Sequence, residues 1–338
     1  MSPDEIDKAM AYEARKFASH ARVWESAWGE TCGFFTDTTA LSSMQFTHYI
    51  SGHISNNHAG SSPETLQVFS IKLTEIVAGL AWPLAVYGVI AVRDIADHNR
   101  NLLFCCDRSQ AQELNQDDSF LRLIGPSRAI VLTDIVDIEI QLKVKGPTKS
   151  QDKVLISYVC NYGGEGLGVS ILCIDNCLCI LELCLQRVKR TVQATILSAQ
   201  VVKCGSWPFE YGGRVACSPT SGEMVVTDGG VTHAINPSSS QIVLLESKDE
   251  AMRKGVDGNI YLPRQVISVE TEGLLDVAIE AYSKSGDVTA RGHVCFVPQF
   301  CNISQAKCAI ADVEVVITVA WSLVATSKRE IVAQRQFV

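Results

Sequence analysis

The sequence predicts a mainly β protein in which two tandem β-sandwich repeats follow an N-terminal amphipathic helix. A stretch around Trp82 returns around Trp207, which indicates two copies of one domain-sized unit. Apolar and polar residues alternate along both halves, as on half-buried strands, whereas the N-terminal residues have helical spacing. We therefore expect five segments: a helical arm over 1–43, a polar linker over 44–65, sandwich repeats over 66–190 and 191–326, and a tail over 327–338.

The repeated stretch aligns without a gap. Ala81–Ala91 matches Ser206–Ala216 at an offset of 125 residues. A tryptophan, a proline and a glycine recur at matching places, and we predict that they mark equivalent structural positions in the two repeats: Trp82, Pro83, Gly88, Trp207, Pro208 and Gly213.

Alternation with a period of two predicts the strands. It runs over Val68–Thr74 and Val136–Val144 in the first half, and over Leu275–Ala281 in the second. The late strands match at an offset of 139 residues, so 14 extra residues lie in the second copy, and the turn-rich stretch 218–240 is the natural place for them. Each copy then holds about seven or eight short strands, which is typical of a β-sandwich.

Residues 4–28 are predicted to form the amphipathic helix. Ser2 and Glu5 fit a capping box, and Pro3 suits the first turn. Apolar residues recur at spacings of three, four or seven along one face: Ile6, Met10, Phe17, Ala21, Trp24 and Trp28. Such a face either packs on its own protein, which is the commoner case, or captures an unknown protein partner as an arm.

Composition narrows the class of protein. With 338 residues, 47% hydrophobic and 20% charged, the chain has the composition of a folded globular protein of about two domains. Its formal net charge of -8 opposes binding to a polyanion, and its longest basic cluster is Arg187–Arg190. We expect no nucleic-acid partner.

No signal for export or for membrane insertion is expected. The N-terminus is acidic where a secretory signal would be basic and then apolar. Thirteen cysteines, an odd count without paired spacing, are typical of reduced thiols and predict a cytoplasmic or nuclear location. Ile76–Val92 has no charged residue, but Pro83 interrupts it and its second copy carries Glu210, so no transmembrane segment is predicted.

Three motifs could hold a metal or a phosphate, and each has a plainer explanation. Four cysteines lie in an apolar strand pair without the close spacing of a structural zinc site: Cys173, Cys177, Cys179 and Cys184. Three histidines recur every five residues, which matches neither a helix face nor a strand face: His48, His53 and His58. Gly163–Gly168 lacks the Lys-Ser/Thr ending of a nucleotide loop and precedes a strand, so we expect a hairpin turn and no cofactor.

The densest polar constellation follows a buried strand, at Arg93–Asn101. It places Arg93, Asp94, Asp97 and Arg100 on one loop. These side chains could bind an ion or a polar ligand at a sandwich edge, or they could neutralise each other as a turn network, which is the commoner outcome. The second copy has Cys217–Thr220 at this place, so the constellation belongs to one repeat.

Several ordered motifs resemble a known family. They are Met44–Tyr49, Leu66–Ser70, Trp82–Leu84, Val86–Gly88, Val92–Asp94, Arg100–Phe104, Leu123–Ala129 and Leu142–Gly146. Over about residues 44–325 they resemble the cereal domain of unknown function 6598, a family of grasses with no assigned activity. Some of its members are named as similar to a large jasmonate-induced protein, whose separate N-terminal part is a ribosome-inactivating N-glycosidase. The resemblance implies a plant protein of stress or defence.

That name suggests one enzymatic alternative. A glycosidase glutamate with an arginine three positions on matches Glu250 and Arg253 alone, in a charged turn without a stacking tyrosine pair. We therefore expect no catalytic residue and favour a non-enzymatic interaction protein of unknown ligand, with recognition loops around 93–101 and 218–240. Two alternatives stay open: an accessory or degenerate relative of the rRNA N-glycosidases, and a calcium-dependent membrane-surface binding module that would use Asp94 and Asp97.

Overall fold

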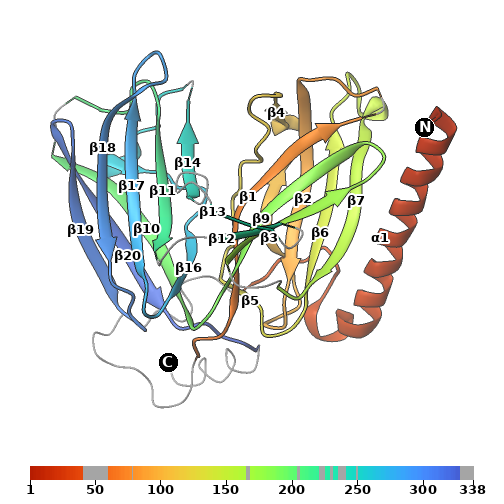
Figure 1. Ribbon diagram of the computed structural model, residues 1–338, viewed down its shortest axis with the longest axis horizontal. Helices are drawn as coiled ribbons and strands as arrows, with labels where there is room; N and C mark the ends of the chain where they lie inside the picture. Colours follow the sequence, from red (N-terminus) through yellow and green to blue (C-terminus); the bar gives the residue numbers. More distant parts are fainter. Residues whose placement is uncertain are drawn as a thin grey trace.

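The strands of the computed structural model form two β-sandwiches that stand side by side, with a long helix along the outer flank of the first (Figure 1). The structure describes residues 1–40, 60–77, 79–164, 168–203, 206–220, 225–228, 231–234, 241–248 and 250–327. His48, His53, His58 and the predicted linker as far as residue 59 lie outside the described residues, as does 328–338 of the predicted tail.

The first sandwich is built from two sheets of the first half of the chain. One contains β1 (Thr65–Ile76), β5 (Ile130–Val131), β8 (Gly168–Asp175) and β9 (Cys179–Val188). The other contains β2 (Leu84–Arg93), β3 (Asn101–Cys106), β4 (Gln112–Leu114), β6 (Val136–Val144) and β7 (Lys153–Tyr162). Short 3-10 turns lie at η1 (Arg108–Gln110) and η2 (Lys149–Gln151). Because β7 and β8 belong to different sheets, the segment 163–168 crosses between sheets and closes no hairpin, and its residues 165–167 are outside the described part.

The second sandwich repeats this construction. One sheet contains β10 (Thr191–Lys203), β15 (Asn259–Ile260), β16 (Val266–Glu270), β19 (Ile303–Ile310) and β20 (Val313–Ser322). The other contains β11 (Gly213–Thr220), β14 (Ile242–Ser247), β17 (Leu274–Tyr282) and β18 (Val288–Phe296), and η4 (Val256–Gly258) precedes β15. The predicted fold class, mainly β with two tandem sandwiches after an N-terminal helix, is confirmed.

Alternating side chains explain why these segments pair as sheets. Along β6, Val136, Ile138, Ile140 and Leu142 are at most 1% exposed and lie in the core of the first sandwich. Apolar residues of β10, β17 and β20 do the same in a separate core in the second half. Each sandwich therefore has its own buried core, as the period-two pattern predicts.

Strand pairing has the same pattern in both halves. β1 pairs with β9 and β5, and β10 pairs with β20 and β16. Gly88 pairs with Leu142 and Gly213 with Ala281, and a Cβ atom on either glycine would collide with a carbonyl oxygen of the facing strand. The two glycines therefore have the same register in their sheets. The division of the halves between residues 190 and 191 stays a prediction.

The matched tryptophans belong to the connections that precede β2 and β11. Trp82 packs against the core of the first sandwich, and its bond to Pro83 is cis. Trp207 precedes Pro208, packs against the second core, and donates from Nε1 to the carbonyl oxygen of Met252 at 3.0 Å. Both pairs therefore lie where a sheet-to-sheet connection meets the core.

The predicted insertion contains strands. β12 (Val225–Asp228) and β13 (Val231–Ala234) form an antiparallel pair, and β12 pairs in parallel with β8, Val226 opposite Val169. The second repeat thereby adds two strands to a sheet of the first. β-branched residues around an Asp-Gly turn are the sequence signal for such a hairpin, and the expectation of a loop over 218–240 overlooked it.

A buried arginine joins the two sandwiches. Arg264 is 1% exposed and donates from Nη1 to the carbonyl oxygen of Phe69 at 3.1 Å and from Nη2 to that of Val68. These carbonyl groups lie at a bulge in β1, and the Phe69 ring packs in the core of the second sandwich. Burial lowers the pKa of Arg264 to about 10.

The N-terminal helix α1 (Pro3–Cys32) packs on the first sandwich. The Ser2 amide donates to Glu5 Oε2 at 2.7 Å, as the predicted capping box requires, and the helix ends at Gly33 with a φ of 94°. Phe17 and Trp24 are buried against Phe35 in a small cluster of their own. Packing on its own protein thus accounts for the apolar face, and a role in capturing a partner stays a prediction. No described helix is long and apolar enough to cross a membrane.

Candidate functional site

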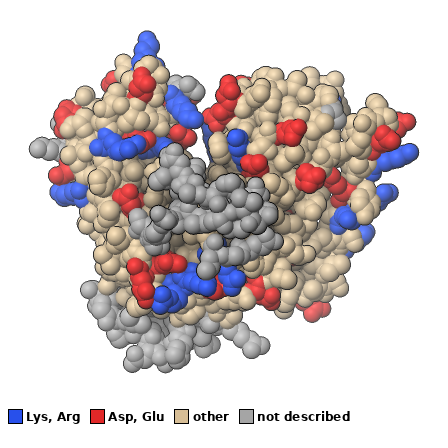
Figure 2. All heavy atoms as spheres, viewed as in Figure 1, with Lys and Arg blue, Asp and Glu red and all other residues tan. Residues whose placement is uncertain are grey.

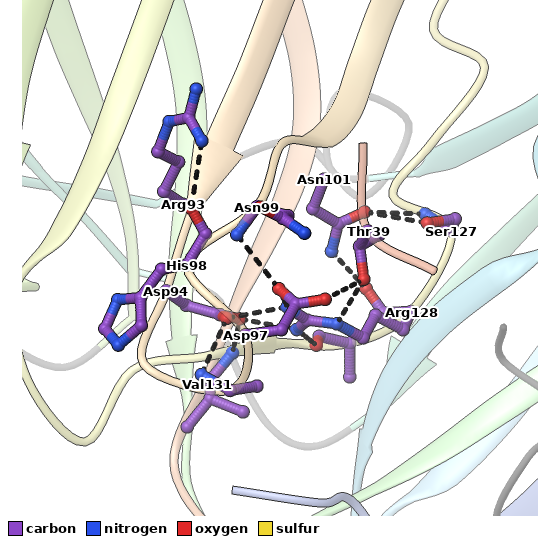
Figure 3. Close-up of polar contacts among 12 residues, drawn as sticks. Thr39, Arg93, Asp94, Asp97, His98, Asn99, Asn101, Ser127, Arg128 and Val131 are labelled. Carbon is purple, nitrogen blue, oxygen red and sulfur yellow. Dashed lines mark hydrogen bonds and ion pairs between the residues drawn. The ribbon is translucent and has the colours of Figure 1, made fainter. Parts of the chain in front are cut away.

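The four residues singled out from the sequence lie in the interior, where the β2–β3 loop meets the last turns of α1. Figure 3 shows three of them, Arg93, Asp94 and Asp97, with their polar contacts. Arg93 and Asp94 are each 3% exposed, Asp97 is 4% and Arg100 is 7%. Two charged residues from distant strands or loops complete the group. We call these six residues the latch cluster: Arg93, Asp94, Asp97, Arg100, Arg128 and Glu139.

Arg93 holds the segment that follows α1. Its Nε donates to Glu139 Oε1 at 2.5 Å and its Nη1 to the carbonyl oxygen of His98 at 2.9 Å, and its Nη2 donates to the carbonyl oxygen of Phe35. The guanidinium lies 4.4 Å from the ring centre of Trp24 and 4.3 Å from that of Phe35. One side chain therefore joins strand β2, its following loop and the helical segment.

Arg100 contacts the same carboxylate from the other side. Its Nε donates to Glu139 Oε2 at 2.8 Å, and its guanidinium lies 4.8 Å from the ring centre of Phe35. His20 of α1 places Nε2 3.5 Å from Glu139 Oε1. Burial alone would raise the pKa of Glu139, but the hydrogen bond from Arg93 and the charges of Arg93 and Arg100 hold it below its ordinary value.

Arg128 pairs with both loop carboxylates. It donates to Asp94 Oδ2 at 2.6 Å and Oδ1 at 2.7 Å, and to Asp97 Oδ1 at 2.9 Å. Thr39, in the segment after α1, donates to Asp97 Oδ2. Burial alone would lower the pKa of Arg128, but the charges and hydrogen bonds of Asp94 and Asp97 raise it.

Backbone amides donate further hydrogen bonds to these carboxylates. Asp94 accepts from the amides of Ala96 at 3.1 Å and Val131 at 2.8 Å, and Asp97 accepts from the amide of Asn99 at 3.2 Å. Each carboxylate oxygen of Asp94 and Asp97 thus has a partner within the protein. This arrangement matches the turn network weighed from the sequence, and an ion-binding or ligand-binding role for the loop stays a prediction.

The ring of His98 adds an apolar contact at the end of α1. It stacks on Trp28 with ring centres 3.6 Å apart and planes 14° apart, and the Trp24 indole donates to its carbonyl oxygen at 3.0 Å. Burial lowers the pKa of His98, so the ring is neutral near pH 7 and stacks without a charge to solvate. The last turns of α1 are therefore held by both charge and ring stacking.

Sequence reasoning missed Glu139 and Arg128. Glu139 lies inside an alternating strand where the pattern predicts a solvent-facing position, and Arg128 lies in a loop 28 residues from Arg100. The sequence shows each of these residues only as a charged side chain, and the structure shows that both are buried. Pairing between β2 and β6 brings Glu139 opposite Ala91, next to Arg93, and only the sheet register reveals this.

Other residues weighed for chemistry are dispersed. Glu250 and Arg253 are exposed on a surface loop, and Met252 between them is buried in the core. The four cysteines predicted as core thiols differ in burial. Cys179 is buried and Cys177 and Cys184 are half-buried, whereas Cys173 is exposed, so the prediction of a core thiol is wrong at Cys173. Within the described part of the chain, no group of three or more His, Cys, Asp or Glu side chains is placed to hold a metal ion.

Two neighbouring loops at one end of the second sandwich expose large apolar side chains. Val256 is 83% exposed, Tyr261 77% and Tyr211 50%. Trp207 is half-buried beside them, and Lys254 Nζ lies 5.7 Å from its ring centre. We call these four residues the aromatic end: Trp207, Tyr211, Val256 and Tyr261.

Hydrogen bonds fix the loop that carries Val256. The Gly255 amide donates to the carbonyl oxygen of Asn259 at 2.8 Å, and Gln200 Nε2 of β10 donates to that of Asp257 at 2.8 Å. The Met252 amide donates to the carbonyl oxygen of Phe209 at 3.0 Å and ties the two loops together. The exposed side chains are therefore presented on backbone that is already ordered.

A shallow hollow lies at the same end of the second sandwich. Its volume is about 310 Å³, and its lining comes from the end of β14 and the β17–β18 turn: Lys248, Tyr282, Lys284, Ser285, Gly286 and Val288. Lys248 Nζ lies 3.5 Å from Asp118 Oδ2 of the first sandwich. One of the two lysines in the hollow is thus already paired across the two halves.

Solved structures give weak likenesses. The tandem C2 domains of extended synaptotagmin 2 are 9% identical, cover 85% of this chain and 99% of their own, and have a TM-score of 0.24. Human GIVD cytosolic phospholipase A2 is 6% identical with a TM-score of 0.23, over 78% of this chain and 33% of that protein. Its complex with methyl gamma-linolenyl fluorophosphonate is 8% identical with a TM-score of 0.24, over the same shares of the two chains. Likenesses of this size carry no argument about function.

Sequence comparison is more decisive. None of the curated proteins matches the chain. The model of one family, described as "Domain of unknown function (DUF6598)", matches residues 65–319, from the start of β1 into β20. This match covers more than half of the sequence, and the chain therefore belongs to the DUF6598 family.

Proposed function

We propose that this protein is a non-enzymatic interaction protein that binds a partner protein through the aromatic end. The observation that carries the proposal is the exposure of Val256 and Tyr261, 83% and 77%, on loops closed by their own hydrogen bonds. Large apolar side chains exposed on ordered loops are typical of interaction surfaces, and tyrosine and tryptophan are enriched there. The family resemblance adds a context of stress or defence in a grass, and the cysteine content adds a cytoplasmic or nuclear location.

The charge distribution favours a protein partner over a polyanion. On the face shown in Figure 2, Lys and Arg are interspersed with Asp and Glu. The formal net charge is -8, whereas a nucleic-acid surface needs a clustered positive field. A mixed rim around an apolar centre is the pattern of transient protein interfaces.

The two rival functions find less support. A calcium site at the β2–β3 loop would need carboxylate oxygens of Asp94 and Asp97 that Arg128 and backbone amides already occupy. A glycosidase role would need Glu250 in a cleft, and this residue is exposed on a loop. We retain ribosome depurination as the outcome that would contradict the proposal.

The proposal is tested with two matched double variants. V256S/Y261S removes the exposed apolar side chains of the aromatic end, and V297S/F300S makes the same kind of change on the β18–β19 connection of the same sandwich, where these residues are 67% and 49% exposed. Affinity capture from extract of the source tissue, quantified by mass spectrometry, compares both with the wild type. We expect partners held by the wild type and the control to be lost with V256S/Y261S.

Two results would overturn the proposal. Equal capture by all three proteins would exclude the aromatic end as the binding surface. Release of adenine from purified ribosomes by the wild type, abolished in E250Q, would show that the protein is an enzyme. Circular dichroism confirms that each variant is folded before either readout is taken.

A further inference from the structure

The contacts between the two sandwiches are reciprocal. Thr65 begins β1 and Thr191 begins β10, at corresponding positions of the two halves, and Thr65 Oγ1 donates to Thr191 Oγ1 at 3.0 Å. Both side chains are fully buried. In a twofold interface, a residue that touches its own counterpart lies on the symmetry axis.

A pair of glutamines crosses the interface in both directions. Gln67 Oε1 accepts from the amide of Ser268 at 2.9 Å, and Gln193 Oε1 accepts from the amide of Ala129 at 2.7 Å. Gln67 and Gln193 lie two residues after Thr65 and Thr191, and Ala129 and Ser268 each stand two residues before the last residue of their matched strands, β5 and β16. With an offset of 139, Ala129 corresponds to Ser268, so the same bond is made from each side.

The ends of the strands follow the same symmetry. β9 ends at Val188 and leads through Lys189 and Arg190 into β10. On the other side, Ser61 and Val324 exchange two backbone hydrogen bonds of 3.0 Å, which brings the start of β1 beside the end of β20. The covalent link on one side is thus matched by a non-covalent pairing on the other.

These contacts are those of an isologous interface, in which the same patch of each half meets the other. Symmetry is closest near the threonine pair and weakens away from it, where Arg264 makes bonds that Gly125, its counterpart, has no side chain to make. An isologous contact forms equally well within a chain and between chains, because its partners are the same in both cases.

We propose that a second copy of this chain can take over this interface by exchange, so that the first sandwich of each chain packs on the second sandwich of the other. The exchanged dimer keeps the Thr65–Thr191 contact and both glutamine bonds. Only the hinge between β9 and β10, which consists of Lys189 and Arg190, changes from a turn to an extended connection. Arg190 has a φ of 45°, which is unfavourable for a non-glycine residue, so opening the hinge relieves a local strain.

Two substitutions at Arg190 test the hinge in opposite directions. R190P forbids a positive φ and favours an extended Lys189, whereas R190G accepts the closed turn without strain. Both remove the exposed ion pair between Arg190 Nη1 and Glu272 Oε1, at 2.8 Å, so this loss cancels in the comparison. Light scattering after size exclusion should show a dimer fraction more than about tenfold higher for R190P than for R190G.

Mixing distinguishes exchange from surface association. R190P chains carrying two different tags are combined either as folded proteins or after joint unfolding and refolding. Exchange requires opened chains, so mixed dimers should form on refolding and only slowly between folded proteins. Immediate mixing of folded proteins, or an R190P protein as monomeric as R190G, would overturn the proposal. If R190P does not fold, wild-type protein refolded at high concentration decides, and its recovery as monomer alone would also overturn it.

Discussion

The latch cluster gives a sharp prediction for Glu139. Replacing this glutamate with glutamine keeps the shape of the side chain but removes the negative charge between Arg93 and Arg100, which are 3% and 7% exposed. Breaking a buried ion pair from one side typically costs about 3–5 kcal/mol, because it leaves charge buried without compensation. Two guanidiniums lose their carboxylate here, while each keeps an aromatic contact with Phe35, so we expect a loss of about 3 kcal/mol in the free energy of unfolding.

The same substitution at Glu314 is the control. Glu314 pairs with Lys307 at 2.8 Å, their side chains are 38% and 62% exposed, and exposed pairs contribute about 0–1 kcal/mol. Urea unfolding followed by tryptophan fluorescence compares E139Q and E314Q with the wild type. Trypsin provides a second readout, since release of α1 from the sandwich should speed cleavage at sites in the helix such as Lys16. Equal stability losses in the two variants would refute the account of the cluster.

The effect of E139Q should depend on pH in a defined direction. The pKa of Glu139 is lowered in the folded protein, so its carboxylate stabilises the fold above its unfolded pKa of about 4.3 and this contribution is lost as pH falls through the folded pKa. The difference in unfolding free energy between wild type and E139Q should therefore be full at pH 7 and shrink below about pH 4. A difference that is constant from pH 7 to pH 3 would contradict this origin.

Three further predictions follow from single contacts. G88A should destabilise the first sandwich strongly in thermal unfolding, because its Cβ would collide with the carbonyl oxygen of Gln141, whereas G29A, with open space around it, should leave the protein as stable or more so. R264M should cost about 2–3 kcal/mol in urea unfolding, because the two carbonyl groups it contacts would lose buried donors. Iodoacetamide should label exposed Cys105 well before buried Cys217, whose thiol pKa is raised by burial, and mass spectrometry after timed quenching measures the order.

Local sequence patterns predicted those elements of the fold whose formation depends mainly on residues close together in the chain. Val136–Val144 was expected to be a strand and is β6, because its alternation buries one face whatever its neighbours are. The capping signal at Ser2 and Glu5 likewise needs only the first helical turn. The helix was predicted to end at residue 28, where the apolar pattern stops. In the structure α1 continues for another turn, to Cys32, and ends before Gly33.

Contacts between distant segments of the chain could not be predicted from local sequence patterns. The Arg93–Asn101 loop was recognised as unusually polar, but Glu139 becomes its neighbour only once β2 and β6 are paired, and Arg128 reaches it from the segment that leads into β5. The β12–β13 hairpin had a local signal, but its parallel pairing with β8 could not be predicted from it, because β8 belongs to the other repeat. In both cases the missing information was sheet register across the chain.

Comparison of the two repeats explains why the latch cluster exists in one of them. With the offsets of 125 and 139 residues, its members Arg93, Asp94, Arg128 and Glu139 correspond to uncharged residues in the second copy: Ser218, Pro219, Ile267 and Ala278. The pairing of β11 with β17 sets Ala278 opposite Ala216, just as Glu139 lies opposite Ala91, so the backbone at this place is the same and only the side chains differ. A sandwich of this type therefore forms without the charged cluster.

The first repeat has α1 and the segment after it in addition. Arg93 contacts the Phe35 carbonyl oxygen and the Trp24 ring of this part of the chain, and Asp97 accepts a hydrogen bond from the Thr39 hydroxyl. The cluster thus docks the helix, and a chain lacking residues 1–40 should fold its second sandwich normally while Arg93 and Arg100 lose their contacts with the rings of Trp24 and Phe35.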